Sequence, residues 1–322
     1  MDETYALFCS RFGKNRVKEK EPLSKHTYFK IGGPADIYIQ ALTKDDLEKA
    51  VTLCRELEIP FFMLGSGSNI LVGDGGFRGV VIHNKASDVH VVGLKGHRSP
   101  DEEKKEVFVE AESGALFNHL VRYTISEGLQ GLEGFLGTPG TIGGALFNNA
   151  HFKDKLIGDF VTSAVILTKE GRKDVDRSYF RFAYDYSILH ETHDILLSAV
   201  FCLLPGNKEE LWKIATESVT RRRDTQPLDL PSSGCAWKNV EGGKLSTGYL
   251  IDECGLKERS VGGAKISGKH ANFIVNGGRA SAQDVITLMK LAHDVVKEKF
   301  GYTLEPEIFF IGEFQENPFR KE

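Results

Sequence analysis

The chain has 322 residues, 41% hydrophobic and 27% charged, a composition typical of a globular protein with a full core and two or three domains. The formal net charge of −4 excludes a general attraction to nucleic acid, and no apolar run is long enough for a transmembrane helix. The five cysteines are scattered without a C-x-x-C spacing, and the N-terminus lacks a basic-then-apolar signal pattern. We therefore expect a cytoplasmic protein with reduced thiols, no membrane insertion, no nucleic-acid partner and no metal site.

The first 85 residues alternate strand and helix patterns and predict an α+β unit. Residues 1–21 are polar and charged, which predicts a short helix and a mobile lead. Apolar residues at helical spacing follow Thr43, the expected N-cap, and Pro60 ends this helix. Strands are predicted before the glycine–proline turn at residues 32–34 and at residues 36–41, 61–64 and 79–84.

The middle of the chain predicts a second group of strands and helices. Residues 95–106 are charged and contain Pro100, which indicates a solvated hairpin loop. A linker with Pro227 and Pro231 indicates a domain boundary near residues 206–230. Strands are predicted at residues 107–111, 157–168 and 195–204, and helices at residues 116–127 and 208–223.

The last third predicts a smaller α+β domain. Ser281 and Asp284 have the spacing of a capping box at the start of a long helix. Helices are predicted at residues 244–254 and 281–299, and strands near residues 264–267, 272–275 and 303–311.

Two glycine-rich loops are the most informative stretches. Residues 136–150 read LGTPGTIGGALFNNA, and residues 64–79 read LGSGSNILVGDGGFRG. Glycine at this density is unfavourable inside a helix or strand, so it predicts tight turns whose backbone N–H groups can close on an anion. Neither loop has the Rossmann or P-loop spacing. The pair therefore predicts a dinucleotide bound in another way, and the alternative is two ordinary turn-rich loops.

Two clusters in the last third can carry proton chemistry. Residues 232–239 read SSGCAWKN and place a thiol, a lysine and an amide in one turn, while residues 303–309 read TLEPEIF with two carboxylates around a proline. A thiol can give up a proton, and a carboxyl group in an apolar site can stay protonated and donate a hydrogen bond. The alternatives are a packed cysteine and a solvated strand end.

Six segments together resemble the UDP-N-acetylenolpyruvoylglucosamine reductase (UDP-N-acetylmuramate dehydrogenase) family over residues 23–312. They read, in the family's order, HTYFKIGGPA, LGSGSNILVGDGGFRG, GTPGTIGGALFNNA, RRRDTQPLDLPSSGCAWKN, GYLIDECGLKERSVGGAKISGKHANFIVN and LEPEIFFIG. The short linker at residues 189–195 resembles the shorter, second type of the family.

The resemblance implies an α+β fold. It consists of a two-part FAD-binding domain of the vanillyl-alcohol-oxidase-like (PCMH) kind and a smaller α+β substrate-binding domain. The implied bounds are residues 1–85 and 86–206 for the two FAD-binding subdomains and residues 207–322 for the substrate-binding domain.

The resemblance also implies the site residues, with FAD and NADPH as cofactors. The residues expected around the FAD pyrophosphate are Gly65, Ser66, Gly67, Ser68 and Asn69. Those expected on the flavin side are Gly140, Thr141, Gly143, Gly144 and Ala145. Cys235 is expected to protonate the substrate and Glu307 to be the second catalytic residue. The residues expected to bind the nucleotide sugar are Lys238, Asn239, Lys257 and His270.

The implied reaction is the NADPH-dependent reduction of UDP-N-acetylglucosamine enolpyruvate to UDP-N-acetylmuramate for peptidoglycan, by a monomer. This enol ether is conjugated with a carboxylate, so its reduction needs a donor for the developing charge and a proton at the carbon beside the carboxylate.

Two positions depart from the family pattern. Asp185 stands where the segment F-x-Y-R-x-S usually has arginine, and Phe309 stands where an arginine tends to follow the catalytic glutamate. The cation for the substrate carboxylate is therefore left open among Arg181, Lys238 and Arg259. The alternative function is that of an FAD-binding relative with lost or altered reductase activity.

Overall fold

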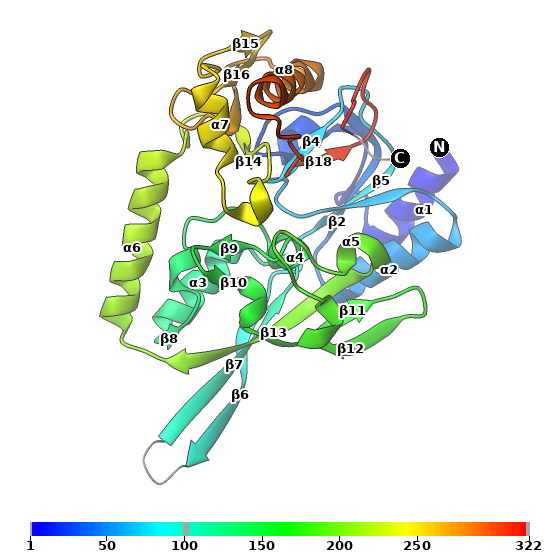
Figure 1. The fold of residues 1–322 in the computed structure, drawn as a ribbon. Coiled ribbons are helices and arrows are strands. Elements are labelled where there is room, and N and C mark those ends of the chain that lie inside the picture. The colour runs from blue at the N-terminus through cyan, green and yellow to red at the C-terminus, as the bar shows by residue number, and fades with distance from the viewer. Residues whose placement is uncertain (1, 99–102, 320–322) are drawn as a thin grey trace. The chain divides into compact units, whose positions relative to one another are not determined.

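The structure is a computed structural model that describes residues 2–98 and 103–319 (Figure 1). Its residues fall into two compact units, each assembled from segments that are far apart in the sequence. Unit 1 contains Met1–Gln40, Leu53–His83 and Arg223–Glu322, and unit 2 contains Ala41–Thr52 and Asn84–Arg222. The last third of the chain therefore shares a unit with the first strands.

The N-terminal part of unit 1 is a four-stranded sheet below the first glycine-rich loop. Its strands lie in the order β1 (Val17–Pro22), β2 (Pro34–Ala41), β5 (Phe77–Asn84) and β3 (Phe61–Leu64). β1 and β2 are antiparallel, whereas β3 and β5 are parallel. Helix α1 (Asp2–Phe12) precedes the sheet, and α2 (Lys44–Glu56) connects β2 with β3.

Two predictions for this region are wrong. β1 has the almost entirely polar sequence VKEKEP, so no apolar alternation marks it, and its pairing with β2 makes it a strand. The strand predicted directly before the glycine–proline turn is not formed, because residues 23–26 form a short 3-10 helix and residues 27–33 lie outside helices and strands. Gly33 packs directly against the backbone of the loop, where an added Cβ would lie 2.2 Å from Asp74 O.

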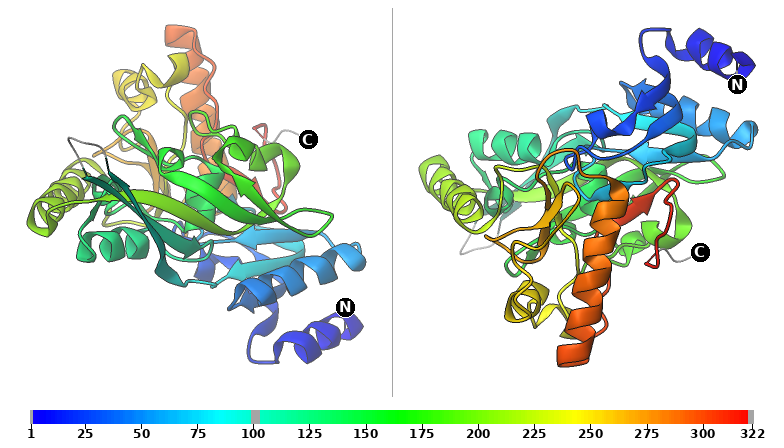
Figure 2. Two further views of the ribbon diagram at one scale, coloured as in Figure 1. Left: turned by 90° about the horizontal axis from the view of Figure 1, so that it is seen from below. Right: turned by 90° about the horizontal axis from the view of Figure 1, so that it is seen from above.

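The C-terminal part of unit 1 is a second four-stranded sheet covered by helices. Its strands lie in the order β14 (Ser232–Cys235), β17 (Phe273–Asn276), β16 (Ala264–Ile266) and β15 (Ser260–Val261). Helix α8 (Ala282–Phe300) packs against β15 and β16 and contacts α7 (Thr247–Glu253), as Figure 2 shows. Ser281 Oγ accepts a hydrogen bond from Asp284 N at 3.1 Å, and Asp284 Oδ2 accepts one from Ser281 N at 2.9 Å, which confirms the capping box.

The strand predicted at residues 303–311 is formed only at its end. β18 (Phe309–Ile311) pairs in parallel with β4 (Ile70–Val72), which lies within the first glycine-rich loop at residues 64–79. Pro306 has no N–H to donate to a ladder and makes only an isolated bridge with Trp237. This pairing joins the end of the chain to the glycine-rich loop of the same unit.

Unit 2 is built on a six-stranded sheet. Five strands lie in the order β12 (Arg172–Asp176), β11 (Val161–Leu167), β13 (Ile195–Pro205), β7 (Glu103–Glu112) and β6 (Val89–Arg98), and β8 (Leu129–Gln130) pairs with the end of β13. The helices of this unit are α3 (Phe117–Ser126), α4 (Ile142–Phe147), α5 (Leu189–Thr192) and α6 (Lys208–Thr225). Two further strands, β9 (His151–Phe152) and β10 (Lys155–Leu156), form a small hairpin after α4.

The long hairpin of β6 and β7 corrects the prediction of a loop at residues 95–106. Lys95 pairs with Glu106 and Gly96 with Lys105, so the backbone ladder continues through most of this charged stretch (Figure 1). Residues 99–102, including Pro100, lie outside the described residues. The strands carry no apolar face there, and the sequence pattern therefore could not reveal them.

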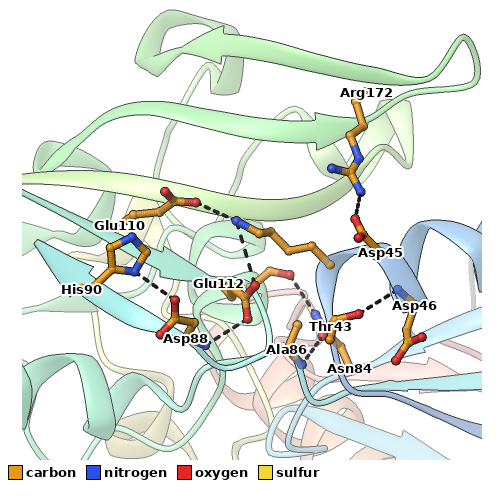
Figure 3. A network of polar contacts seen from close by, with 12 residues as sticks. Thr43, Asp45, Asp46, Asn84, Ala86, Asp88, His90, Glu110, Glu112 and Arg172 are labelled. Carbon is orange, nitrogen blue, oxygen red and sulfur yellow. Dashed lines mark hydrogen bonds and ion pairs between the residues drawn. The ribbon is translucent and has the colours of Figure 1, made fainter. Parts of the chain in front are cut away.

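Within unit 2, ion pairs fix the start of α2 to the sheet (Figure 3). Lys44 Nζ lies 2.9 Å from Glu110 Oε1 and 3.9 Å from Glu112 Oε1, and Arg172 pairs with Asp45. Burial raises the pKa of Glu110, but the hydrogen bonds from Lys44 and Ser198 and the charge of Lys44 together outweigh it and hold this pKa below its ordinary value. The hydrogen bond from Arg172 lowers the pKa of Asp45. These contacts orient α2 toward β7 and β12.

Candidate active site

Cys235 and Glu307 lie on neighbouring backbone segments of unit 1. Cys235 ends β14 opposite Phe273 of β17, and Gly234 before it has a φ of +84°, a turn conformation that favours glycine. Glu307 N donates to Ala236 O at 3.0 Å. The two predicted catalytic residues therefore come from adjacent segments, although 72 positions separate them in the sequence (307 − 235).

Asn272 organises the turn that carries the predicted catalytic thiol. Its side-chain oxygen accepts from Trp237 N at 3.0 Å, its amide donates to Trp237 O at 2.7 Å, and its backbone oxygen accepts from Ala236 N at 2.7 Å. Trp237 is fully buried beneath this turn. The sequence analysis missed Asn272, and the only available signal was a polar residue at the start of an apolar strand.

The predicted sugar-binding residues lie in the same unit. Lys238 N donates to Glu305 O at 2.9 Å, and Lys238 Nζ lies 3.3 Å from Glu305 Oε1. Asn239 Oδ1 accepts from Thr247 N at 3.1 Å, so this side chain supports the start of α7. Lys238 is thus held close to the Glu307 segment by a backbone and a side-chain contact, whereas Asn239 is held at the start of α7.

His270 and Lys257 form a second part of this site. Lys257 Nζ pairs with Asp252 Oδ2 at 2.6 Å, and the His270 ring lies 4.9 Å from the ring of Phe273. Burial lowers the pKa of His270, and the charge of Lys257 lowers it further. The lowered pKa favours the neutral ring, whose Nδ1 accepts from Asn272 N at 3.3 Å, so Nε2 carries the hydrogen and can donate it to a ligand acceptor.

The first turn of the first glycine-rich loop, Gly65 to Asn69, lies beside the Glu307 segment in unit 1. Gly67 has a φ of +69°, and an added Cβ would lie 2.4 Å from His26 O, so only glycine fits. Ser66 Oγ donates to Ser68 Oγ at 3.2 Å. A narrow turn lined by two hydroxyls and unhindered backbone is a suitable cradle for the oxygens of a pyrophosphate.

The second glycine-rich loop lies in unit 2 and contains a short helix. Thr141 is the N-cap of α4, and Gly143 and Gly144 lie inside the helix, where the sequence predicted only turns. Gly143 N donates to Ser113 O at 2.8 Å, and an added Cβ would lie 3.1 Å from the same oxygen. Glycine is tolerated here because the helix packs closely against another backbone segment.

The open side of this helix suits a flat ligand. Gly144 is exposed, and an added Cβ would meet only Thr141 Oγ1 at 3.7 Å. Gly140 has a φ of +139°, while Thr141 and Ala145 are buried beneath the loop. The amide groups of residues 142–145 are already hydrogen-bonded within unit 2, so this loop offers a bare backbone surface rather than several free N–H groups.

Asp185 is nearly buried and pairs with a histidine. Its side chain is 10% exposed, and its Oδ1 lies 3.3 Å from His151 Nδ1. His151 is the residue that directly follows the second glycine-rich loop. Its Oδ2 has no hydrogen-bond partner among the described residues. The residue adopts a φ of +49°. Sequence reasoning missed His151, because nothing in its neighbourhood marks it as the partner of Asp185.

Three basic residues were left open as the cation for a substrate carboxylate. Arg181 is exposed in unit 2, and Arg259 is exposed in unit 1. Lys238 is one-third exposed and already pairs with Glu305. Lys238 is the candidate whose backbone is fixed next to the Glu307 segment.

Within the described residues, no group of three or more histidine, cysteine or acidic side chains is arranged to hold a metal ion. No described helix has the length and apolar character that a membrane span requires. All five cysteines are described, and none forms a disulfide.

Comparison with known proteins places the whole chain in one family. Residues 226–311 match the C-terminal domain of UDP-N-acetylenolpyruvoylglucosamine reductase, and residues 35–173 match an FAD binding domain. The UDP-N-acetylenolpyruvoylglucosamine reductase of Caldanaerobacter subterraneus subsp. tengcongensis is 40% identical over 294 residues, 91% of this chain and 93% of the relative. The reductase of Clostridium botulinum (strain Alaska E43 / Type E3) is 34% identical over 308 residues, 95% of this chain and 97% of the relative.

A solved structure agrees with these sequence matches. The crystal structure of UDP-N-acetylenolpyruvylglucosamine reductase from Thermus caldophilus has a TM-score of 0.74 at 32% identity and covers 92% of this chain and 99% of its own. The predicted α+β fold, with an FAD-binding domain followed by a C-terminal domain, is thereby confirmed. The chain belongs to the UDP-N-acetylenolpyruvoylglucosamine reductase family.

Proposed function

We propose that this chain reduces UDP-N-acetylglucosamine enolpyruvate to UDP-N-acetylmuramate with NADPH, as an FAD-dependent enzyme of peptidoglycan precursor synthesis. Family membership over more than nine-tenths of the chain supports this activity. The structural observation that carries it is the hydrogen bond from Glu307 N to Ala236 O, which places a carboxylate segment beside the segment of a thiol. NADPH oxidation that depends on added UDP-N-acetylglucosamine enolpyruvate tests it, and this assay also separates it from an FAD-binding relative without reductase activity.

Bound FAD would carry the hydride from NADPH to the enolpyruvyl group of the substrate. The proposed holders of its pyrophosphate are Gly65, Ser66, Gly67, Ser68 and Asn69. The proposed flavin-side residues are Gly140, Thr141, Gly143, Gly144 and Ala145. Gly144 supports the flavin-side assignment, because its missing Cβ leaves backbone open to a ligand, and Gly67 supports the pyrophosphate assignment by allowing the tight turn that the close approach to His26 O requires.

The remaining roles belong to the chain's own side chains. Cys235 donates a proton to the substrate carbon beside the carboxylate, and Glu307 donates a hydrogen bond to the charge that develops there. Lys238, Asn239, Lys257 and His270 bind and orient the nucleotide sugar. The contacts that fix Lys238 beside the Glu307 segment and Asn239 at the start of α7 support this division of roles.

The domain roles follow the same proposal. Residues 1–85 and 86–206 bind FAD, and residues 207–322 bind the sugar nucleotide. The FAD-binding match at residues 35–173 and the reductase C-terminal match at residues 226–311 support these roles. We also propose that the enzyme is a cytoplasmic monomer, and its five cysteines without disulfides are consistent with a reducing compartment.

Purified protein is expected to be yellow and to release FAD when it is denatured. The two glycine-rich loops motivate this expectation. Absorbance spectra of the purified protein and chromatography of the released cofactor measure it. Folded protein that stays colourless and takes up no added FAD would remove the basis of the proposed function.

Asp185→Arg is expected not to raise turnover and to lower stability by roughly 1 to 3 kcal/mol. The Asp185 side chain is nine-tenths buried beside His151, so the longer arginine side chain does not fit in its place. Its positive charge would also face the histidine instead of a carboxylate. Asp185→Asn, which keeps the size, is the control. Thermal unfolding and steady-state NADPH oxidation measure both effects, and a large gain in turnover would show that the wild-type site is impaired.

A further inference from the structure

Asn69 holds the backbone on both sides of Ile308, and the resemblance did not indicate this contact. The Asn69 side-chain amide donates to Glu307 O at 3.2 Å, and the Asn69 backbone oxygen accepts from Phe309 N at 3.1 Å. One residue of the first glycine-rich loop therefore binds two points of the segment that carries the catalytic carboxylate. The ladder between β4 and β18 begins at the next residue, where Ile70 pairs with Phe309.

The Glu307 backbone is consequently fixed from two directions. Its N–H donates to Ala236 O at 3.0 Å, beside the Cys235 turn, and its C=O accepts from Asn69. Ile308, the next residue, is 3% exposed and packs in the core of unit 1. A rotation of the Glu307 backbone would break one of these hydrogen bonds or move Ile308 out of the core.

Asn69 is chemically suited to this contact. Because the acceptor is a carbonyl oxygen, the contact requires a donor, which the amide supplies and an aspartate carboxylate does not. The amide reaches across the turn from a loop that Gly67 fixes against His26 O. The loop that carries Gly65 to Asn69 and the segment that carries Glu307 thus form one hydrogen-bonded element of unit 1.

We propose that Asn69 is a positioning residue that couples the first glycine-rich loop to Glu307, so that an ordered loop sets the position of the catalytic carboxylate. This inference rests on the proposed function, because it assigns Glu307 to the step in which the enolpyruvyl substrate is reduced. It gives the Asn69 side chain a role beyond the FAD site to which the resemblance assigned it.

The test compares the two half-reactions of Asn69→Ala at saturating FAD. Because Asn69 is also assigned to the FAD pyrophosphate, saturating FAD keeps that site filled. Bleaching of the flavin absorbance by NADPH is then expected to slow much less than the second half-reaction, because this step does not use Glu307. Recovery of the absorbance on addition of the enolpyruvyl substrate without oxygen is expected to slow by on the order of 10- to 100-fold, as for a misplaced catalytic group. Asn69→Asp is expected to be at least as slow, because two oxygens would face each other.

Asn276→Ala is the matched control. Asn276 also donates its side-chain amide to a backbone carbonyl of unit 1, Phe29 O at 3.1 Å, and its side-chain oxygen accepts from Gly278 N and Ala280 N, so these hydrogen bonds go to segments other than that of Glu307. It is expected to lower stability and to leave the ratio of the two half-reactions unchanged. If Asn69→Ala does not fold, Asn69→Ser, which keeps a shorter donor, is measured in the same way.

Two further measurements separate positioning from a general structural role. In a Glu307→Gln background, Asn69→Ala is expected to slow the second half-reaction no further, because both changes act through the same group. Without FAD, amide hydrogen exchange across residues 305–311 is expected to become faster in Asn69→Ala than in Asn276→Ala.

Equal loss in both half-reactions, additive effects with Glu307→Gln, or a loss confined to FAD affinity would each overturn the inference. Wild-type protein that NADPH reduces but the enolpyruvyl substrate does not reoxidise would instead contradict the proposed function. The exchange measurement still tests the Asn69 contact in that case, so the two failures are distinguishable.

Discussion

Cys235→Ala is expected to retain the first half-reaction and to lose the second by about a hundredfold to ten-thousandfold. Reduction of the flavin by NADPH requires only that the nicotinamide and the flavin are in contact, and it does not use the Cys235 thiol. The second half-reaction needs a proton at the carbon beside the carboxylate, which alanine does not supply. Reduced protein should therefore accumulate when both substrates are present and oxygen is excluded, and stopped-flow absorbance measures the two rates separately.

Serine and a remote cysteine provide the controls for this experiment. Cys235→Ser is expected to recover much of the activity, because a hydroxyl can occupy the same place on β14. Cys202→Ala is the control with a remote cysteine, since Cys202 lies in β13 of unit 2, and it is expected to change neither half-reaction. Burial raises the pKa of the Cys202 thiol, so this thiol is a weaker acid than an exposed one. If Cys235→Ala reoxidises as fast as wild type, Cys235 is a packing residue and another group is the acid.

Glu307→Gln is expected to slow the second half-reaction to a similar extent, on the order of a hundredfold or more, with little change in the first. Glutamine keeps the size of the side chain, but its amide is a far weaker acid and hydrogen-bond donor than a carboxyl group. The backbone contacts with Ala236 and Asn69 are independent of the side chain. The loss therefore reports the chemistry of the carboxyl group and not its placement. Anaerobic stopped flow and the apparent KM for the enolpyruvyl substrate measure it.

Glu298→Gln, on the exposed surface of α8, is the matched control and is expected to behave as wild type. The catalytic role would be contradicted if Glu307→Gln raised the KM and left the rate of reoxidation unchanged. That result would indicate that Glu307 binds the ground state and the transition state of the substrate equally well. Equal losses in both half-reactions would indicate a disturbed fold.

Local signals in the sequence predicted most helices and about half of the strands. Two examples are the capping box of Ser281 with Asp284 and the helical spacing of apolar residues after Thr43. Both signals depend only on residues that are close in the sequence, and the structure has both helices. β1 and the outer part of the β6–β7 hairpin were missed because their strands are stabilised by backbone pairing with distant or equally polar partners. The composition of the two units depends on such long-range contacts and was not predicted.

The candidate site was predicted through resemblance more than through local chemistry. Cys235 and Glu307 were singled out as possible acids, but the contact between their segments depends on Asn272 and on the bridge of Trp237 with Pro306. The glycine-rich loops were visible as composition, whereas the close packing that makes Gly67 and Gly143 necessary appears only in three dimensions. The pairing of Asp185 with His151 was likewise invisible, since 34 positions separate the two residues (185 − 151).

A single-turnover reaction tests the central proposal most directly. The protein is reduced with one equivalent of NADPH without oxygen, and UDP-N-acetylglucosamine enolpyruvate is then added. The expected result is rapid return of the oxidised-flavin absorbance and one equivalent of UDP-N-acetylmuramate, heavier than the substrate by two hydrogen atoms. Reduced protein that keeps its spectrum until oxygen is admitted, with the enolpyruvyl substrate recovered unchanged, would contradict the account.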